Sequence, residues 1–347
     1  MIGLALGISA VGCGHDAQRA AQVVHDPTTI GQAHRSAHSR VTAATGRRAG
    51  PAAPGRPARA TARYPVGERI VTFVDRSRRI QPAGQRSRPR TLVTVVRYPA
   101  ASPAPGTDVR NAAPARAGGP FPLVVFGHGF AVTPKPYARL LRAWTRAGYV
   151  VAAPIFPLES SGAPGGPDES DLVNQPRDLR FVISRMLAAS ADPRNPLAGT
   201  VAADRIAVAG QSDGGETALA TAYDSHYLDD RVRAAMILSG AEIPGAGGFF
   251  FPPRSPPLLA VQGTADTINQ PRFTYAFFRR ARRPKFLLRL LGAGHLPPYT
   301  VEQPQLSIVE RVTVAFMDRY LKHEHSARVR MVGAGDVPGT SRLITRP

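Results

Sequence analysis

Between residues 122 and 321, short apolar runs rich in β-branched residues alternate with longer amphipathic segments. Such an alternation predicts repeated strand–helix units, which form a mostly parallel sheet with helices on both faces. The predicted strands are Leu123–Phe126, Tyr149–Ala153, Arg205–Ala209, Ala234–Leu238, Leu258–Val261 and Phe286–Leu290. The predicted helices are Lys135–Ala147, Pro176–Ala189, a segment ending at Tyr223, Arg272–Arg282 and Leu306–Leu321.

Two more strands precede this pattern. Arg69–Val74 and Leu92–Tyr98 are rich in β-branched and aromatic residues, and the stretch between them is rich in Arg and Pro. We therefore expect an antiparallel pair of strands joined by a loop. With 347 residues, of which 43% are hydrophobic, the chain can bury one large core. We expect a single α/β domain over residues 63–325 and an irregular C-terminal tail over residues 326–347.

The first 13 residues form a short apolar run that ends in small residues and Cys13. This pattern is typical of an export signal, and Ala10-Val11-Gly12-Cys13 resembles a bacterial lipobox, whose cysteine becomes lipidated. The run is too short to span a membrane. We therefore expect a secreted or cell-envelope protein, with membrane attachment through Cys13. An ordinary cleaved signal or a fortuitous apolar N-terminus are the alternatives.

Residues 14–62 are rich in Ala, Arg, Pro and Gly and show no apolar periodicity, which predicts a disordered basic linker. The formal net charge of +20 is concentrated near the N-terminus, since residues 1–90 hold 15 Arg and 4 acidic residues. No RNA-binding signature or zinc-ligand set accompanies these charges, so nucleic acid is not an expected partner.

Gly210-Gln211-Ser212-Asp213-Gly214 matches the pattern G-x-S-x-G and lies between an apolar strand and an Ala-rich helix. This context is typical of a nucleophile elbow, a sharp turn that exposes a serine hydroxyl at the edge of the sheet. A turn without a chemical role that joins strand to helix is the alternative reading.

A nucleophilic serine needs a base, and the base needs an orienting carboxylate. Asp266 and His295 each follow a predicted strand, so both fall at the same sheet edge as Ser212. Their order along the chain, Ser, Asp, His, is the order of this type of site. Glu242, which follows the preceding strand, is a rival for the acid, and Asp266 could instead cap a helix.

The oxyanion that forms during acyl transfer needs two backbone N–H donors. One should come from Asp213, the residue after the nucleophile. The other should come from the loop Gly127-His128-Gly129-Phe130-Ala131, where Phe130 is the first choice and Ala131 the second. We expect His128 to support this loop rather than to act chemically.

Together these motifs resemble the α/β-hydrolase superfamily over residues 66–321. The branch resembled includes dienelactone-hydrolase-like proteins, chlorophyllases, platelet-activating-factor acetylhydrolases and bacterial cutinases or polyester hydrolases. Dienelactone hydrolases use cysteine, so Ser212 argues against that activity. Gln211 and Asp213 stand where bacterial polyester hydrolases usually have His and Met.

The resemblance implies a serine carboxylic ester hydrolase that acts on a small-molecule or lipid-like ester through Ser212, His295 and Asp266. The sequence contains no metalloprotease, P-loop or dinucleotide-binding motif, so neither a metal nor a cofactor is expected. Two alternatives use the same fold: an acyltransferase with the same triad, and an inactive binding protein of the cell envelope.

Overall fold

The computed structural model describes residues 63–101 and 108–347. The predictions for the apolar N-terminal run, for Cys13 and for the linker of residues 14–62 lie outside the described residues. Within the described part, no helix has both the length and the apolar character that a membrane span requires.

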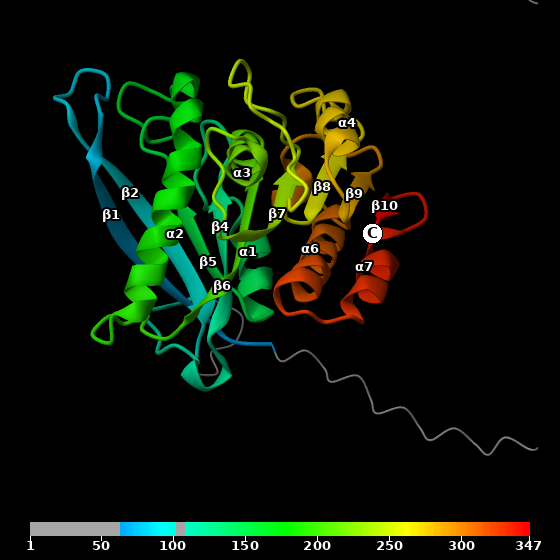
Figure 1. Cartoon of the computed structure of the whole chain (residues 1–347), viewed down its shortest axis with the longest axis horizontal. Coiled ribbons are helices and arrows are strands. Elements are labelled where there is room, and N and C mark those ends of the chain that lie inside the picture. Colours follow the sequence, from blue (N-terminus) through cyan, green and yellow to red (C-terminus); the bar gives the residue numbers. More distant parts are fainter. Residues whose placement is uncertain (1–62, 102–107) are drawn as a thin grey trace, which may run out of the picture. The chain divides into compact units, whose positions relative to one another are not determined.

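Ten strands of the described part form one sheet, and its centre is parallel (Figure 1). The order across the sheet is β10-β9-β8-β7-β6-β4-β5-β2-β1-β3, in which β4 to β9 are parallel to one another. The strands are β1 (Val66–Ile80), β2 (Arg88–Pro99), β3 (Asp108–Arg110), β4 (Phe121–Gly127), β5 (Val150–Pro154), β6 (Val201–Gln211), β7 (Val232–Leu238), β8 (Leu258–Gly263), β9 (Lys285–Leu290) and β10 (Ser341–Arg346).

Helices cover both faces of this sheet. The α-helices are α1 (Ala138–Arg146), α2 (Gln175–Ala191), α3 (Asp213–Tyr223), α4 (Pro271–Arg280), α5 (Pro297–Thr300), α6 (Gln305–Leu321) and α7 (Ala327–Gly335), and the 3-10 helices are η1 (Arg116–Gly118) and η2 (Glu169–Asn174). Side chains of α2, α3 and α4 pack in one apolar core, and those of α1, α6 and α7 pack in another.

The two cores explain the sequence pattern of the central strands. Strands β4, β5 and β8 are buried along their whole length because helices cover them on both sides. The α1 and α6 helices are joined by Trp144, which is fully buried and whose indole N–H donates to Thr313 Oγ1 at 2.8 Å. The predicted mostly parallel sheet with helices on both faces and N-terminal antiparallel strands is confirmed.

The predicted irregular tail over residues 326–347 is wrong. Residues Ala327–Gly335 form α7, and Ser341–Arg346 form β10, which pairs antiparallel with β9 at the edge of the sheet. The buried side chains of Met331 and Leu343 belong to the same core as α6. Residues 326–347 look irregular in sequence because their order comes from contacts with distant segments.

The Arg-rich stretch between the first two strands is also more ordered than predicted. Strands β1 and β2 extend into it, and only residues 81–87 connect them. The reason is a network of ion pairs between this hairpin and the helices η2 and α2. Arg90 is 2% exposed and donates to Asp171 at 2.8 and 2.6 Å and to Asp178 at 2.7 and 2.6 Å. Arg78 also donates to Asp178, at 2.7 Å. Charged side chains that suggested a solvated loop therefore hold the hairpin against η2 and α2.

Candidate active site

Ser212 lies in the sharp turn between β6 and α3, with φ = 55° and ψ = −127°. A positive φ is strained for a residue with a side chain, so the surrounding turn must hold it in place. The glycines on either side make this turn possible. A Cβ on Gly210 would overlap the carbonyl of Gly214, and a Cβ on Gly214 would overlap that of Gly127. The hydroxyl is thereby held at the carboxyl ends of the parallel strands and at the N-terminus of α3.

His295 and Asp266 approach Ser212 from the loops after β9 and β8. Ser212 Oγ lies 2.8 Å from His295 Nε2, and His295 Nδ1 lies 2.8 Å from Asp266 Oδ2. Ser212 is 7% exposed and Asp266 is 3% exposed, so this chain of hydrogen bonds is almost closed to solvent. The structure brings together the three side chains that the sequence selected.

The carboxylate of Asp266 is held in its ionised form. Burial acts to raise its pKa, but the hydrogen bond and the charge of His295 act against this, and the pKa lies below its usual value. The backbone N–H of Ile268 adds a further hydrogen bond to Asp266 Oδ1 at 3.0 Å. Glu242, the rival acid, pairs with Arg280 at 2.7 Å and makes no hydrogen bond to His295.

The loop after β4 packs directly against the nucleophile. A Cβ on Gly129 would lie 3.0 Å from Ser212 Cβ, so the backbone of this loop passes beside the reacting atom. The N–H of Ala131 donates to the carbonyl of Glu159 at 3.0 Å and is thus not free to bind an oxyanion. The N–H of Phe130 has no acceptor within the described residues. Asp213 is the first residue of α3, where an N–H has no partner inside its own helix.

Tyr137 and Gln211 connect this loop to the base, and the sequence predicted a role for neither of them. Tyr137 is fully buried, and its hydroxyl accepts from the N–H of Gly129 at 3.4 Å and donates to Gln211 Oε1 at 2.6 Å. Gln211 Nε2 donates to the carbonyl of His295 at 3.1 Å. One buried hydrogen-bonded chain therefore runs from the oxyanion loop to the backbone of the base. Only the position of Gln211 beside Ser212 could have drawn attention to it.

Three buried carboxyl groups surround the elbow. Burial, with the charge of Asp213 as the next cause, raises the pKa of Glu159 to about 9 and that of Glu216 to about 8. Burial and the charge of Glu169 raise the pKa of Asp213 to about 6. Asp213 Oδ1 lies 3.4 Å from Ser212 Oγ. The turn is therefore acidic in composition, but Glu159 and Glu216 are protonated at neutral pH.

His128 is fully buried in the loop after β4. Its Nε2 accepts from the N–H of Phe156 at 3.0 Å, and burial lowers its pKa to about 4. These contacts agree with the supporting role expected from the sequence. No group of three or more His, Cys, Asp or Glu side chains suited to a metal ion occurs in residues 63–101 and 108–347.

Two comparisons with known proteins agree with this arrangement. Residues 83–239 match the sequence model of the chlorophyllase family. The fold is similar to that of a ferulic acid esterase from Streptomyces cinnamoneus, with a TM-score of 0.56 and 24% sequence identity, over 79% of this chain and 93% of that chain. No curated protein matches the chain.

The strand order, the helices on both faces and the serine elbow are those of the α/β-hydrolase fold. The chain is thus similar to the chlorophyllase family over residues 83–239, and its fold is similar to that of an esterase.

Proposed function

We propose that the protein hydrolyses carboxylic esters through an acyl-enzyme formed on Ser212, with His295 as the base and Asp266 as its orienting carboxylate. The observation that carries the proposal is the pair of 2.8 Å contacts that joins Ser212 to His295 and His295 to Asp266. Nucleophile, base and orienting acid at hydrogen-bonding distance are the arrangement that acyl transfer requires.

The reaction proceeds in two stages. Ser212 Oγ attacks the ester carbonyl carbon while His295 Nε2 accepts the hydroxyl proton, and the carbonyl oxygen becomes an oxyanion. The intermediate then collapses, the bond to the alkoxy oxygen breaks, and His295 protonates the departing alcohol. In the second stage His295 takes a proton from water, the water oxygen attacks the acyl carbon, and a second oxyanion forms. This intermediate collapses, the bond between the acyl carbon and Ser212 Oγ breaks, and His295 returns the proton to Ser212 Oγ as the carboxylic acid leaves. Asp266 holds the proton on His295 Nδ1 throughout.

Backbone donors stabilise the oxyanion in both stages. We assign this role to the N–H groups of Phe130 and Asp213, because the first has no acceptor in the described residues and the second starts α3. The helix N-terminus adds a partial positive charge at the same place. Ala131, the second candidate from the sequence, donates to Glu159 instead.

The substrate is a small-molecule or lipid-like ester with an apolar part. Phe130 and Ile268 lie in the loops that follow β4 and β8 and are 40% and 66% exposed, and we assign the apolar part of the substrate to these two side chains. The ferulic acid esterase with the similar fold makes esters of ferulic acid a natural choice in a substrate panel, next to p-nitrophenyl esters of increasing acyl length.

The proposal is tested with the purified protein and this ester panel. Ser212→Ala should fold as the wild type does and lose at least about three orders of magnitude in kcat/KM, since triad members act as a unit. A fluorophosphonate probe should label the wild type and not the variant. A Ser212→Ala sample that keeps a tenth of the activity would exclude Ser212 as the nucleophile.

The two candidate acids provide a matched comparison. Asp266→Ala should lose most of the activity, because the Nδ1–H of His295 then has no carboxylate partner. Glu242→Ala removes a carboxylate that contacts Arg280 and not His295, so its activity should stay within about twofold of the wild type. The reverse result would transfer the acid role to Glu242.

We also propose that the protein is exported and attached to the membrane of a bacterial envelope through Cys13. The support is the apolar run that ends in the lipobox-like Ala10-Val11-Gly12-Cys13. Several buried acyl chains anchor a protein firmly, because each buried CH₂ contributes about 0.8 kcal/mol. Expressed in a bacterial host, the protein should partition into a detergent phase, and Cys13→Ser should move it to the aqueous phase with unchanged kcat/KM. Equal partitioning and an intact mass without lipid would refute the anchor.

A further inference from the structure

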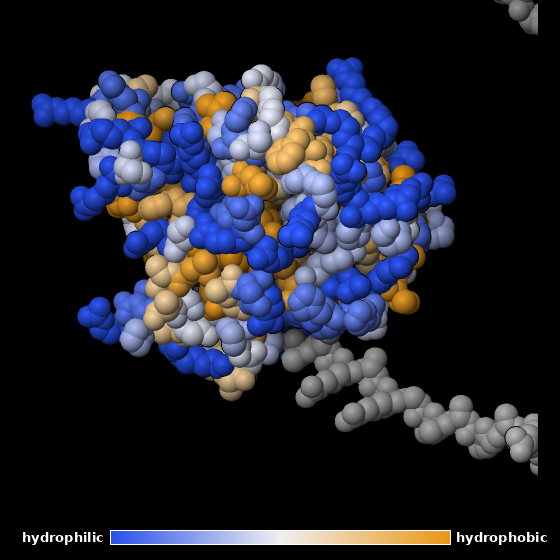
Figure 2. Space-filling view, in the orientation of Figure 1, coloured by the Kyte–Doolittle hydropathy of each residue, from blue (hydrophilic) through white to orange (hydrophobic). Residues whose placement is uncertain are grey.

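A cleft of about 860 Å³ lies at the edge of the sheet formed by β9 and β10, next to the end of α4. Its apolar lining consists of Tyr275, Phe278, Ala281, Leu287 and Ile344. Its charged lining consists of Arg279, Arg280, Arg282, Arg283, Lys285, Arg289 and Arg346. None of the residues proposed for ester hydrolysis takes part in it. Figure 2 shows hydrophilic side chains crowded over the side of the molecule that carries α4 and β10.

The cleft has no acidic side chain among the residues that line it. Three of its cations are held by the fold: Arg280 pairs with Glu242 at 2.7 Å, Lys285 Nζ donates to carbonyls at the end of α4 at 2.7 to 3.0 Å, and Arg282 Nε donates to the carbonyl of Phe251 at 3.3 Å. Apart from Arg280, none of the seven cations has a carboxylate within 4.0 Å in the described part of the chain. Arg289 also has a buried Nε atom without a hydrogen-bond partner.

The register of the edge strands sets like charges against each other. Lys285 on β9 is opposite Arg346 on β10, and Arg289 is opposite Arg342. Like charges at directly opposite positions of an antiparallel pair destabilise it. Burial lowers the pKa of Lys285, and the charges of Arg283 and Arg346 lower it further. Cations on an edge strand can prevent strand-to-strand aggregation. That role does not require cations on both partners, nor a lining without acids.

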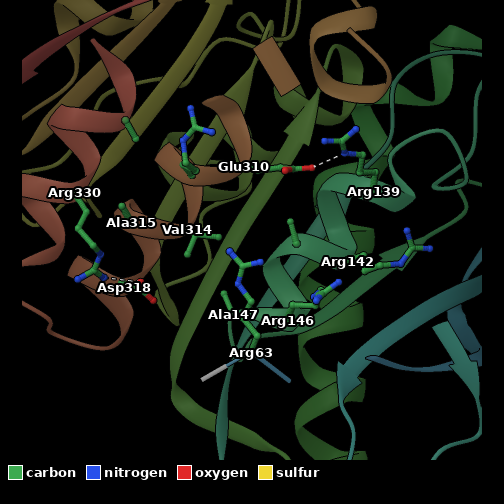
Figure 3. Close-up of a pocket in the computed structure, with 13 residues that line it drawn as sticks. Arg63, Arg139, Arg142, Arg146, Ala147, Glu310, Val314, Ala315, Asp318 and Arg330 are labelled. Atoms are coloured by element: carbon green, nitrogen blue, oxygen red, sulfur yellow. Dashed lines mark hydrogen bonds and ion pairs between the residues drawn. The ribbon is translucent and has the colours of Figure 1, made fainter. Parts of the chain in front are cut away.

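A second arginine-rich cleft shows how the chain balances such charges elsewhere. Figure 3 shows it between α1, α6 and α7, with Arg139 directed at Glu310 and Arg330 at Asp318. These pairs measure 3.1 and 2.8 Å. In the cleft at the sheet edge, Arg280 alone of the seven lining cations has a carboxylate partner within the described residues, so the charge of the other six is free to attract an anion.

We propose that the cleft at the sheet edge binds a phosphate-bearing amphiphile, with the phosphate on the arginines and the apolar part against Leu287 and Ile344. The planar guanidinium group matches phosphate oxygens with two parallel hydrogen bonds. The bound phosphate offsets the repulsion between Lys285 and Arg346. This binding goes beyond ester hydrolysis and does not depend on it.

The phosphate group that binds the cleft could belong to a phospholipid headgroup or to a soluble phosphate compound. Two probes distinguish these sources. The first is a phosphatidylcholine vesicle with or without phosphatidylglycerol, used in a flotation assay. The second is inorganic pyrophosphate, used in titration calorimetry. The double variant Arg283→Ala/Arg346→Ala should weaken the binding of whichever probe the wild type binds by at least about tenfold.

The control removes the same charge elsewhere: Arg110→Ala/Arg194→Ala changes two exposed arginines that do not line the cleft. It should bind as the wild type does, apart from a small general effect of net charge that added salt removes. Binding to the vesicles alone supports a headgroup, and binding to pyrophosphate supports a soluble ligand. Equal losses in the two double variants, or no binding of either probe, would overturn the proposal.

A charge reversal tests the repulsion between Lys285 and Arg346 without the need for a binding assay. Arg346→Glu places a carboxylate opposite Lys285, and in the absence of ligand it should raise Tm by roughly 1–3 °C. A bound anion stabilises the wild type by mass action, and this ligand-dependent rise in Tm should disappear in the variant. A variant that is less stable than the wild type, yet gains the same Tm from the anion, would contradict the mechanism.

Discussion

Glu159 is expected to make the stability of the fold depend on pH across the neutral range. Its side chain is completely buried, Oε2 accepts from Gln175 Nε2, and Oε1 has no partner. Burial and the charge of Asp213 raise its pKa from the usual 4.5 to about 9. The folded state therefore binds a proton that the unfolded chain releases near pH 4.5.

This difference determines whether the fold gains or loses stability as the pH rises. Because the folded-state pKa of Glu159 is the higher one, its contribution to stability is complete below about pH 4.5 and is lost as the pH rises toward about 9. One pKa unit corresponds to about 1.4 kcal/mol, so within this window Glu159 lowers the free energy of unfolding by up to about 1.4 kcal/mol per pH unit. For a domain of this size that is a fall in Tm of roughly 3–5 °C per pH unit. Glu216, with a pKa of about 8, adds to the slope in the lower part of the window.

The assay is differential scanning calorimetry between pH 5 and pH 9. Glu159→Gln keeps the shape of the side chain but cannot ionise, so its Tm should fall less steeply with pH, and above pH 7 it should exceed that of the wild type. The control is Asp204→Asn, because the Asp204 side chain is 85% exposed and should leave the slope unchanged. Equal slopes in the wild type and in Glu159→Gln would refute the reasoning.

Two further predictions concern the contacts that hold the hairpin and the base. Arg90→Met should lower the free energy of unfolding by about 3–5 kcal/mol in urea titrations, because it leaves Asp171 buried without a cation and Asp178 with Arg78 alone. A loss below about 1 kcal/mol would contradict this prediction. Tyr137→Phe removes the hydroxyl that joins the oxyanion loop to Gln211. We therefore expect kcat to fall by about tenfold, with little change in KM or Tm. A change in KM alone would instead assign Tyr137 to substrate binding.

Local patterns carried the prediction of the fold. The alternation of strand-length and helix-length segments depends on residues that are neighbours in sequence, and it was enough to predict the parallel sheet and its helices. The elbow is also local, since the glycines around Ser212 are required by the backbone of one turn. Parallel strands all end at the same edge of the sheet. Ser212, Asp266 and His295 each follow such a strand, so their positions in the sequence were enough to predict that they lie close together.

Contacts between distant segments decided the rest. Residues 326–347 have no strong pattern of their own, and β10 exists because β9 offers it an unpaired edge. The sequence left Asp266 and Glu242 as rivals, since both follow a strand; the paths of their loops decide which carboxylate reaches His295. The raised pKa of Glu159 and the acid-free cleft beside Lys285 depend on burial and on charges far away in sequence. Burial and long-range charge are properties of the packed molecule, and no window of neighbouring residues contains them.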